Sequence, residues 1–292
     1  MKKSILYQYG ELDCLLYYSK VSHYIKKMLK SKEIATKTIL EDGKFIKRGS
    51  NSPQLYIEDL EYGKNINENF LKLRVGKHLD EVKEKLTEKQ ILIWKYFVPR
   101  KMINFFYACN NEYGKNIERI FIDIDRQNNS SEQARVIAMH LINIIKEDNE
   151  FGNLVKFKPI ILWTGSSFHI YLLLKNKVDL NFYNNYLSYG KNKEKSFIIK
   201  WAEQISKETK LNVKAGHERE KNAIILDSSN TPPGKLARCP FSLHIKEYNK
   251  YDGVSVPLTE KQLENKNLIK KLKKLTPDFV LENIRKYSFI YS

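Results

Sequence analysis

The pentapeptide Phe121-Ile122-Asp123-Ile124-Asp125 ends an apolar run with two carboxylates two positions apart. On a β-strand, residues i and i+2 project to the same face of the sheet, so Asp123 and Asp125 can converge on one divalent cation. We therefore predict a buried strand over residues 119–125 and a metal site where it ends. Acidic pairs also end strands in glycosyltransferases, in phosphatases and in proteins without a metal, so this pair needs support from elsewhere in the chain.

A second apolar run, residues 222–226, ends at Asp227 in the same manner. Three carboxylates at the ends of buried strands form the ligand set of a two-metal site, in which cations bridge acidic side chains and substrate phosphates. Asp227 is followed by Ser228 and Ser229, which suit an ordinary turn equally well.

Between the two acidic strands lies a short turn, Gly165-Ser166-Ser167, followed by His169. Small residues expose backbone N–H groups, and Ser167 and His169 share one face of the predicted strand, so both can donate hydrogen bonds to an anion. We predict that this segment contacts a triphosphate. A histidine beside the aliphatic Ile170 and Leu172 is also common in ordinary cores.

The segment after Asp227 is rich in cationic and hydroxyl side chains that suit phosphate oxygens: Lys235, Arg238, Ser242, His244 and Lys246. Arginine offers a planar fork of donors, and lysine offers a point charge. The dipeptide Gly234-Lys235 lacks the other features of a Walker phosphate-binding loop. A solvated loop with incidental charges is the alternative.

The composition favours a soluble protein that binds a polyanion. The chain has 292 residues, 42% of them hydrophobic, and a net charge of +17. Such an excess of Lys and Arg attracts nucleic acid, although a lysine-rich solvated surface would give the same number. The three cysteines form no CxxC pair, so we expect neither zinc nor a disulfide framework and a reduced, cytoplasmic setting. No run approaches eighteen apolar residues, and the N-terminus lacks a signal-peptide core, so we expect no membrane span and no secretion.

Apolar spacing and turn residues predict the remaining elements. Asp42-Gly43 predicts a β-hairpin of residues 34–40 and 44–48. We predict helices within 5–29, 79–97, 130–146, 196–210 and 259–275, strands at 159–164 and 168–174, and an irregular segment at 179–193. From residue 119 the succession is βαββα, followed by the strand that ends at Asp227.

The order of these motifs resembles the archaeo-eukaryotic primase superfamily. The matching residues are Asp123 and Asp125, then Ser167 and His169, then Asp227, and then Arg238 through Lys246. Residues 240–244 are most similar to the small catalytic subunit of primase. The short Asp227-to-Arg238 connection is also similar to the polymerase domain of end-joining DNA ligases. The motifs span residues 117–258, and the first hundred residues match only loosely.

The resemblance implies an α+β fold and a single primase-polymerase catalytic domain. Its parts would be an N-terminal α/β module (1–115), an RNA-recognition-motif-like catalytic module (116–260) and a basic helical segment (261–292). The catalytic, metal-binding residues would be Asp123, Asp125 and Asp227, with Mg²⁺ or Mn²⁺ in a two-metal site, and the nucleotide would be bound by Ser167, His169, Lys235, Arg238, Ser242, His244 and Lys246. The zinc element of primase small subunits is missing, which favours a minimal primase-polymerase.

The implied activity is template-dependent nucleotidyl transfer from NTP or dNTP, which makes or extends primers on single-stranded or primer-template DNA. A large primase subunit or repair and replication proteins would be its protein partners. Three alternatives remain: an end-joining repair polymerase of the same superfamily, a metal-dependent nuclease, and a non-catalytic nucleic-acid-binding module. The last would not need three carboxylates, which repel phosphates without a metal. The lysines of residues 266–274 either follow template phosphates or form a solvated helix face.

Overall fold

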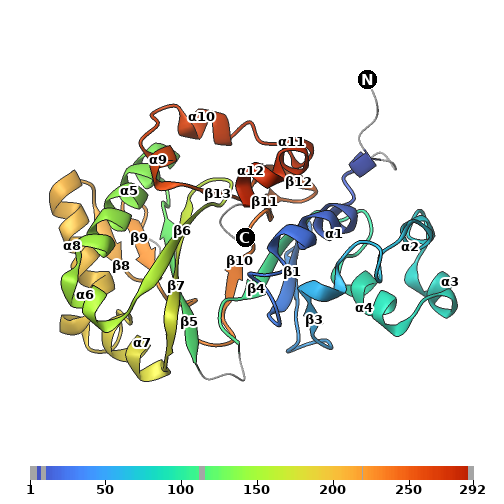
Figure 1. Ribbon diagram of the computed structural model, residues 1–292. Coiled ribbons are helices and arrows are strands. Elements are labelled where there is room, and N and C mark those ends of the chain that lie inside the picture. The colour runs from blue at the N-terminus through green and yellow to red at the C-terminus, as the bar shows by residue number, and fades with distance from the viewer. Residues whose placement is uncertain (1–4, 8–10, 112–115, 219, 289–292) are drawn as a thin grey trace. The chain divides into compact units, whose positions relative to one another are not determined.

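The strand that carries the first two carboxylates, β5 (Ile117–Asp125), lies inside a six-stranded sheet with the order β13-β6-β7-β5-β9-β8. The computed structural model describes residues 5–7, 11–111, 116–218 and 220–288 (Figure 1). The chain forms two units: unit 1 comprises 1–107, 238–255 and 275–292, and unit 2 comprises 108–237 and 256–274. Both units combine helices with strands, so the α+β class is confirmed.

Unit 2 contains the six-stranded sheet and the helices that cover it. The other strands are β6 (Phe157–Trp163), β7 (Phe168–Val178), β8 (Val213–Ala215), β9 (Ile224–Asp227) and β13 (Val256–Leu258). Neighbours pair antiparallel, except for the parallel pair β8 and β9. The helices are α5 (Ser131–Glu147), α6 (Asn149–Leu154), α7 (Leu180–Tyr186), α8 (Phe197–Thr209), α9 (Glu260–Leu263) and α10 (Leu268–Leu272), and a 3₁₀ turn covers Lys193–Lys195.

The predicted βαββα succession is present in unit 2. The chain runs β5-α5-β6-β7-α8-β9, and β7 separates the parallel strands β5 and β6 in space, which is the split βαβ arrangement. Figure 1 shows α5, α6 and α8 on one side of this sheet. Along β5, the fully buried Ile122 and Ile124 alternate with Asp123 and Asp125. We therefore place the isoleucines under the helices and the carboxylates on the opposite face.

Local signals explain why the covering helices begin where they do. The Ser130 hydroxyl accepts a hydrogen bond from the Gln133 N–H (3.1 Å), and the Gln133 side chain accepts one from the Ser130 N–H (2.8 Å), which completes the predicted capping box of α5. Helix α8 buries Trp201, whose ring packs edge-on against Phe151 with 5.0 Å between centroids. The Trp201 indole N–H also donates to Asp148 (2.9 Å), so this buried donor is satisfied.

Unit 1 is built around a second sheet with the order β10-β4-β1-β2, in which β3 also pairs with β1. Its strands are β1 (Glu33–Ile39), β2 (Lys44–Lys47), β3 (Leu55–Tyr56), β4 (Ile103–Ala108) and β10 (Leu236–Arg238), although Ala108, Leu236 and Ala237 fall within the bounds of unit 2. Strands β11 (Leu243–Glu247) and β12 (Lys250–Val254) form a separate hairpin. The helices are α1 (Cys14–Ile25), α2 (Glu68–Leu73), α3 (Leu79–Val82), α4 (Glu88–Tyr96), α11 (Pro277–Glu282) and α12 (Ile284–Ser288), and 3₁₀ turns cover Ile5–Tyr7, Ile57–Asp59 and Lys83–Lys85.

Helix α1 packs on this second sheet through two adjacent tyrosines. The Tyr18 ring lies 4.8 Å from the Phe105 ring, and its hydroxyl donates to the Ile103 carbonyl at 2.6 Å. The Tyr17 hydroxyl donates to the Phe241 carbonyl at 2.8 Å. Burying an aromatic ring while satisfying its hydroxyl gives both apolar burial and a fixed orientation. None of the helices in the described residues is long and apolar enough to cross a membrane.

Two predicted helices are shorter than expected because internal caps interrupt them. Within residues 79–97, a new helix begins after Thr87, whose side chain accepts a hydrogen bond from the Gln90 N–H (3.2 Å). Residues 259–275 form α9 and α10 and not one basic helix. The Asn265 side chain there accepts a hydrogen bond from the Asn267 N–H (2.9 Å) and forms a turn between the two helices.

The prediction of an irregular segment at 179–193 is wrong for its first half. Helix α7 forms there, because Asp179 caps it by accepting a hydrogen bond from the Phe182 N–H at 2.9 Å.

The boundaries of the two units differ from those of the three predicted segments. Residues 238–255, which we expected in the second module, belong to unit 1, and the basic C-terminal segment 261–292 is divided between the units.

A buried asparagine links three segments of unit 2. The Asn110 side chain donates to the carbonyls of Arg119 and Thr231 and accepts hydrogen bonds from the N–H groups of Glu118 (2.8 Å) and Arg119 (3.0 Å). All four hydrogen-bonding positions of its amide are therefore used.

Replacing Asn110 should destabilise the protein strongly. In Asn110→Ala, three buried backbone groups and the partly buried Glu118 N–H lose a partner, so we expect the free energy of unfolding to fall by about 2–4 kcal/mol. Urea denaturation followed by circular dichroism measures it. The exposed Asn153→Ala is the matched control and should change stability by less than about 0.5 kcal/mol. Equal stability of the two variants would contradict the role of Asn110.

Candidate metal and nucleotide site

Three strands of unit 2 bring His169, Asp123 and Asp227 side by side. Asp123 on β5 lies directly opposite Asp227 on β9 and directly opposite His169 on β7. Residues that are directly opposite in a ladder share a face, with Cβ atoms about 4.5–5.5 Å apart. The strand register therefore places two carboxylates and an imidazole in one row across the sheet.

Asp123 contacts His169, whose Nε2 lies 3.3 Å from the Asp123 Oδ1. His169 is 8% exposed, and its ring packs edge-on against Phe121 with 4.8 Å between centroids. Its other nitrogen, Nδ1, is buried and has no hydrogen-bond partner among the described residues. The sequence predicted that His169 would contact phosphate; the structure places its Nε2 beside Asp123, where it orients that carboxylate.

Asp227 is held by donors from two directions. Its Oδ1 accepts hydrogen bonds from the Ser229 N–H (2.7 Å) and from the Tyr189 hydroxyl (3.3 Å). Burial, and to a smaller extent the charge of Asp123, raise the pKa of Asp227, while the hydrogen bonds from Ser229 oppose this shift. Burial, followed by the charge of Asp227, raises the pKa of Tyr189 to about 12. Tyr189 was not among the predicted site residues, because a tyrosine in a polar loop carries no motif.

Asp125 is arranged differently from the other two carboxylates. Both of its oxygens accept hydrogen bonds from Gln127, one from the backbone N–H (3.2 Å) and one from the side-chain amide (2.8 Å). Gln127 adopts a left-handed conformation (φ 48°), which is uncommon for a residue other than glycine. Among the described residues, no group of three or more His, Cys, Asp or Glu side chains forms a ready metal-binding set. The ladder sets only two of the three predicted carboxylates directly opposite each other, and Asp125 lies opposite Ile225 and accepts from Gln127.

The Ser167 hydroxyl connects the β6–β7 turn to the end of β5. It donates to the Ile124 carbonyl, and the Ser167 N–H donates to the Thr164 side chain (3.1 Å). The turn also contains Gly165 with a φ of 105°, a conformation that favours glycine. The Ser167 hydroxyl already donates to the backbone. Its predicted contact with phosphate stays a prediction.

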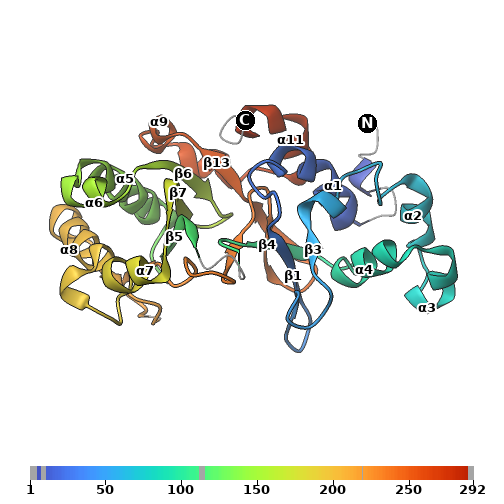
Figure 2. The same cartoon turned by 60° about the horizontal axis from the view of Figure 1, so that its bottom comes forward.

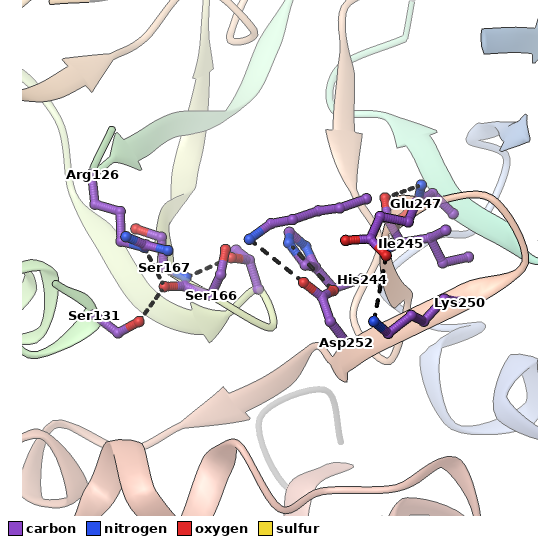
Figure 3. A network of polar contacts seen from close by, with 12 residues as sticks. Arg126, Ser131, Ser166, Ser167, His244, Ile245, Glu247, Lys250 and Asp252 are labelled. Atoms are coloured by element: carbon purple, nitrogen blue, oxygen red, sulfur yellow. Dashed lines mark hydrogen bonds and ion pairs between the residues drawn. The ribbon is translucent and has the colours of Figure 1, made fainter. Parts of the chain in front are cut away.

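The same turn is fixed by two residues that the sequence motifs did not indicate. Figure 3 shows Arg126 and Ser131 converging on the Ser166 carbonyl, which accepts from the Arg126 Nε–H at 3.1 Å and from the Ser131 hydroxyl at 2.8 Å. Arg126 also donates to the Asn129 carbonyl. An arginine directly after the DxD motif is the only sequence signal for this contact. These bonds tie the β6–β7 turn to the connection between β5 and α5.

The predicted phosphate-binding residues divide between the two units. Lys235 lies in unit 2 and is exposed, and its ammonium has no polar partner among the described residues. Arg238 and Ser242 lie in unit 1. Arg238 donates to the Asn104 side chain (3.2 Å) and to the Leu243 carbonyl (2.9 Å), and the fully buried Ser242 accepts from the Phe105 N–H (2.8 Å).

His244 and Lys246, on β11 of unit 1, both lie near Asp252 of β12. The His244 Nε2 is 3.7 Å from the Asp252 Oδ1, and the Lys246 ammonium is 3.5 Å from Oδ2 (Figure 3). His244 and Lys246 reach the same carboxylate although the β11–β12 ladder is irregular on both sides of Ile245. Sequence reasoning missed Asp252, since nothing in the sequence shows which β12 residue faces them. Of the four unit 1 residues, Arg238 and Lys246 carry a fixed positive charge, and Asp252 is the acidic neighbour of His244 and Lys246 alone.

The adjacent pair Asp123 and Asp227 fits a hard divalent cation. Mg²⁺ usually binds one or two carboxylates and completes its shell with water and substrate phosphates. Among the described residues, the donors at hydrogen-bond distance act on Oδ1 of both carboxylates, which leaves Oδ2 able to accept a cation. A cation would offset both the burial and the smaller repulsion from Asp123 that raise the pKa of Asp227. All three cysteines are buried, and none belongs to this set.

The raised pKa of Asp227 predicts a pH-dependent gain in stability for Asp227→Asn. The folded carboxyl keeps its proton to higher pH than the unfolded one, so its favourable contribution is complete below the unfolded pKa and is lost as the pH rises through the folded pKa. In EDTA at pH 7, Asp227→Asn should therefore have a higher free energy of unfolding than the wild type, and the gain should disappear below about pH 4.

Urea denaturation over a pH series measures this difference. The exposed Asp80→Asn on α3 is the control and should show no such pH dependence, since its carboxylate is 91% exposed. A gain that grows toward acid pH would contradict the assigned sign.

No protein-family model and no curated protein sequence matches this chain. Among solved structures, the chain is similar to the polymerase domain from Mycobacterium tuberculosis Ligase D in complex with DNA, with a TM-score of 0.55. The match covers 94% of this chain and 88% of that chain at 12% sequence identity. The likeness concerns the fold and extends over both units, including the first hundred residues, which the motifs matched only loosely.

Proposed function

We propose that this protein is a template-dependent nucleotidyltransferase. A 3′-hydroxyl on a primer strand would attack the α-phosphorus of an NTP or dNTP, and pyrophosphate would leave. The observation that carries the proposal is the register of β5 and β9, which places Asp123 directly opposite Asp227. The likeness of the fold to a ligase polymerase domain and the net charge of +17 support it.

Asp123 and Asp227 would hold Mg²⁺ or Mn²⁺, joined by Asp125 once it leaves Gln127. The cation neutralises phosphate charge and lowers the pKa of a bound hydroxyl. His169 keeps the Asp123 carboxylate oriented through its Nε2. The turn at Gly165, which the Arg126 side chain holds in place, directly precedes the strand that carries His169. Lys235, Arg238, His244 and Lys246 would contact the phosphates, whereas the predicted contact of Ser242 is opposed by its full burial and its bond to the Phe105 N–H. Positioning and charge neutralisation carry such a reaction, which needs no covalent intermediate.

Within this proposal, we favour an extending polymerase of the end-joining type over a replicative primase subunit. The support is the fold likeness to a ligase polymerase domain, together with the short connection between Asp227 and Arg238. Priming without a pre-formed 3′ end requires a second nucleotide site next to the first. Incubation with a single-stranded template, each nucleotide pool in turn, and Mg²⁺ or Mn²⁺, with and without a primer, separates the two activities and identifies the preferred sugar.

Removing either of the paired carboxylates should abolish nucleotide incorporation. We expect Asp123→Asn and Asp227→Asn to lower the rate of primer extension by at least about 10³-fold, because each removes a charged ligand at the reacting phosphate. Gel-resolved extension of a labelled primer with Mn²⁺ and dNTP measures the rate. Asp80→Asn, which removes an exposed carboxylate on α3, should retain wild-type activity.

Circular dichroism verifies that each variant is folded. Wild-type activity in a folded Asp123→Asn variant would refute the proposal. Cleavage of labelled DNA with Mn²⁺ but without nucleotides would identify a nuclease that uses the same carboxylates.

The β1–β2 hairpin of unit 1 carries a surface suited to single-stranded nucleic acid. Phe45 and Ile46 on β2 are each 44% exposed, between Lys44 and Lys47. Strand β2 is at the edge of its sheet, and Figure 2 shows the hairpin projecting below the label β1, away from the helices of unit 1. Aromatic rings that stack on bases, flanked by cations that contact phosphates, are typical of single-strand binding.

Charge reversal on this hairpin should weaken DNA binding in a salt-dependent manner. For Lys44→Glu/Lys47→Glu, we expect the affinity for single-stranded DNA to fall at least about tenfold, with a salt slope smaller by about 2. Fluorescence anisotropy over a salt series measures both quantities. Lys83→Glu/Lys85→Glu, in the exposed 3₁₀ turn after α3, changes the net charge equally and serves as the control. Equal losses in the two variants would show that only total charge matters.

A further inference from the structure

The Tyr189 hydroxyl lies between Asp227 and an exposed histidine, His217. It is 3.3 Å from the Asp227 Oδ1 and 2.9 Å from the His217 Nδ1. Tyr189 follows α7, His217 follows β8, and all three residues belong to unit 2. We propose that Tyr189 is a positioning residue that orients the Asp227 carboxylate for a divalent cation, and that His217 fixes Tyr189. The inference deepens the proposed function and rests on it.

The direction of the hydrogen bonds follows from the inventory of donors. An ionised carboxylate only accepts, so the Tyr189 hydroxyl must donate to Asp227. The Tyr189 oxygen can then accept a hydrogen bond, which the His217 Nδ1–H donates. The donors therefore run from His217 through Tyr189 to Asp227, and His217 carries its proton on Nδ1.

Two donors on one oxygen fix the carboxylate of Asp227. Ser229, whose N–H lies 2.7 Å from Oδ1 and whose side chain also acts on the carboxylate, belongs to the turn that directly follows Asp227. Tyr189 approaches the same oxygen from a different segment of the chain and restricts the carboxylate further. Residues that hold a ligand in this way affect metal affinity without touching the metal. The Tyr189 and His217 rings also lie against each other, with centroids 5.6 Å apart and an interplanar angle of 34°.

The Tyr189 hydroxyl is not needed to anchor its segment. The neighbouring Tyr186 packs its ring on Phe182 (5.2 Å) and Phe197 (6.1 Å), and Tyr183 is buried. These apolar contacts, together with the Asp179 cap, account for the stability of α7 and the start of the following loop. The hydrogen bonds of Tyr189 therefore act on Asp227 and His217 and not on the fold of the helix.

Direct binding of Mn²⁺, without nucleotide or DNA, tests the inference. By isothermal titration calorimetry, we expect the dissociation constant for Mn²⁺ to rise about tenfold in Tyr189→Phe. His217→Gln, at an exposed position, should raise it less. Tyr186→Phe, three residues earlier in the chain, is the matched control and should bind Mn²⁺ as the wild type does. The thermal midpoint in EDTA should be the same for all four proteins.

The metal dependence of primer extension gives a second readout. In Tyr189→Phe, the Mn²⁺ concentration for half-maximal rate should rise about tenfold, while the rate at saturating Mn²⁺ stays close to that of the wild type. A merely structural role would instead lower the rate at every Mn²⁺ concentration.

Two results overturn the inference, and they differ in what they say of the proposed function. Equal Mn²⁺ affinity of Tyr189→Phe, His217→Gln and the wild type overturns the inference alone. A wild-type protein that binds Mn²⁺ no better than Asp227→Asn overturns both the inference and the two-metal proposal.

Discussion

The pairing of β5 with β9 in a register that sets Asp123 opposite Asp227 is the constraint on which the site depends. Two like charges on adjacent strands, beside a buried imidazole, are unfavourable by themselves. A shift of one residue in either strand would send one carboxylate to the helix-covered face, among fully buried isoleucines. The apolar face of the sheet therefore fixes the position of the polar face, because only one register buries Ile122, Ile124 and Leu226 together.

The surrounding hydrogen bonds make this arrangement rigid at some cost in stability. Each carboxylate receives a different neighbour: His169 for Asp123, Gln127 for Asp125, and Ser229 with Tyr189 for Asp227. The raised pKa of Asp227 is the sign of that cost in the absence of a cation. Strain of this kind is typical of sites that are organised for a ligand before it binds. Asn110, whose amide is fully bonded, is the opposite case, because it serves stability and takes no part in the site.

Periodicity and turn residues were sufficient to predict the elements that build the site. The strand β5, the capped helix α5, the turn at Gly165 and the strand β9 all follow from patterns within a dozen residues. Contacts between distant segments were not predictable: Gln127 on Asp125, Arg126 on Ser166, and Tyr189 on Asp227 depend on side-chain directions that no local pattern encodes. Helix ends inside a continuous helical pattern were also missed, since the caps at Thr87 and Asn265 override the apolar spacing.

The division of the chain into discontinuous units has a consequence for its synthesis. The backbone passes from one unit to the other after residues 107, 237, 255 and 274, so unit 1 is assembled from three separated segments and unit 2 from two. On the ribosome, unit 2 lacks its last segment until residue 274 is made, and unit 1 lacks α11 and α12 until residue 288 is made. Neither unit can therefore be completed early as an independent domain. Helix α1 must wait for residues 275–288 before the unit that contains it is closed.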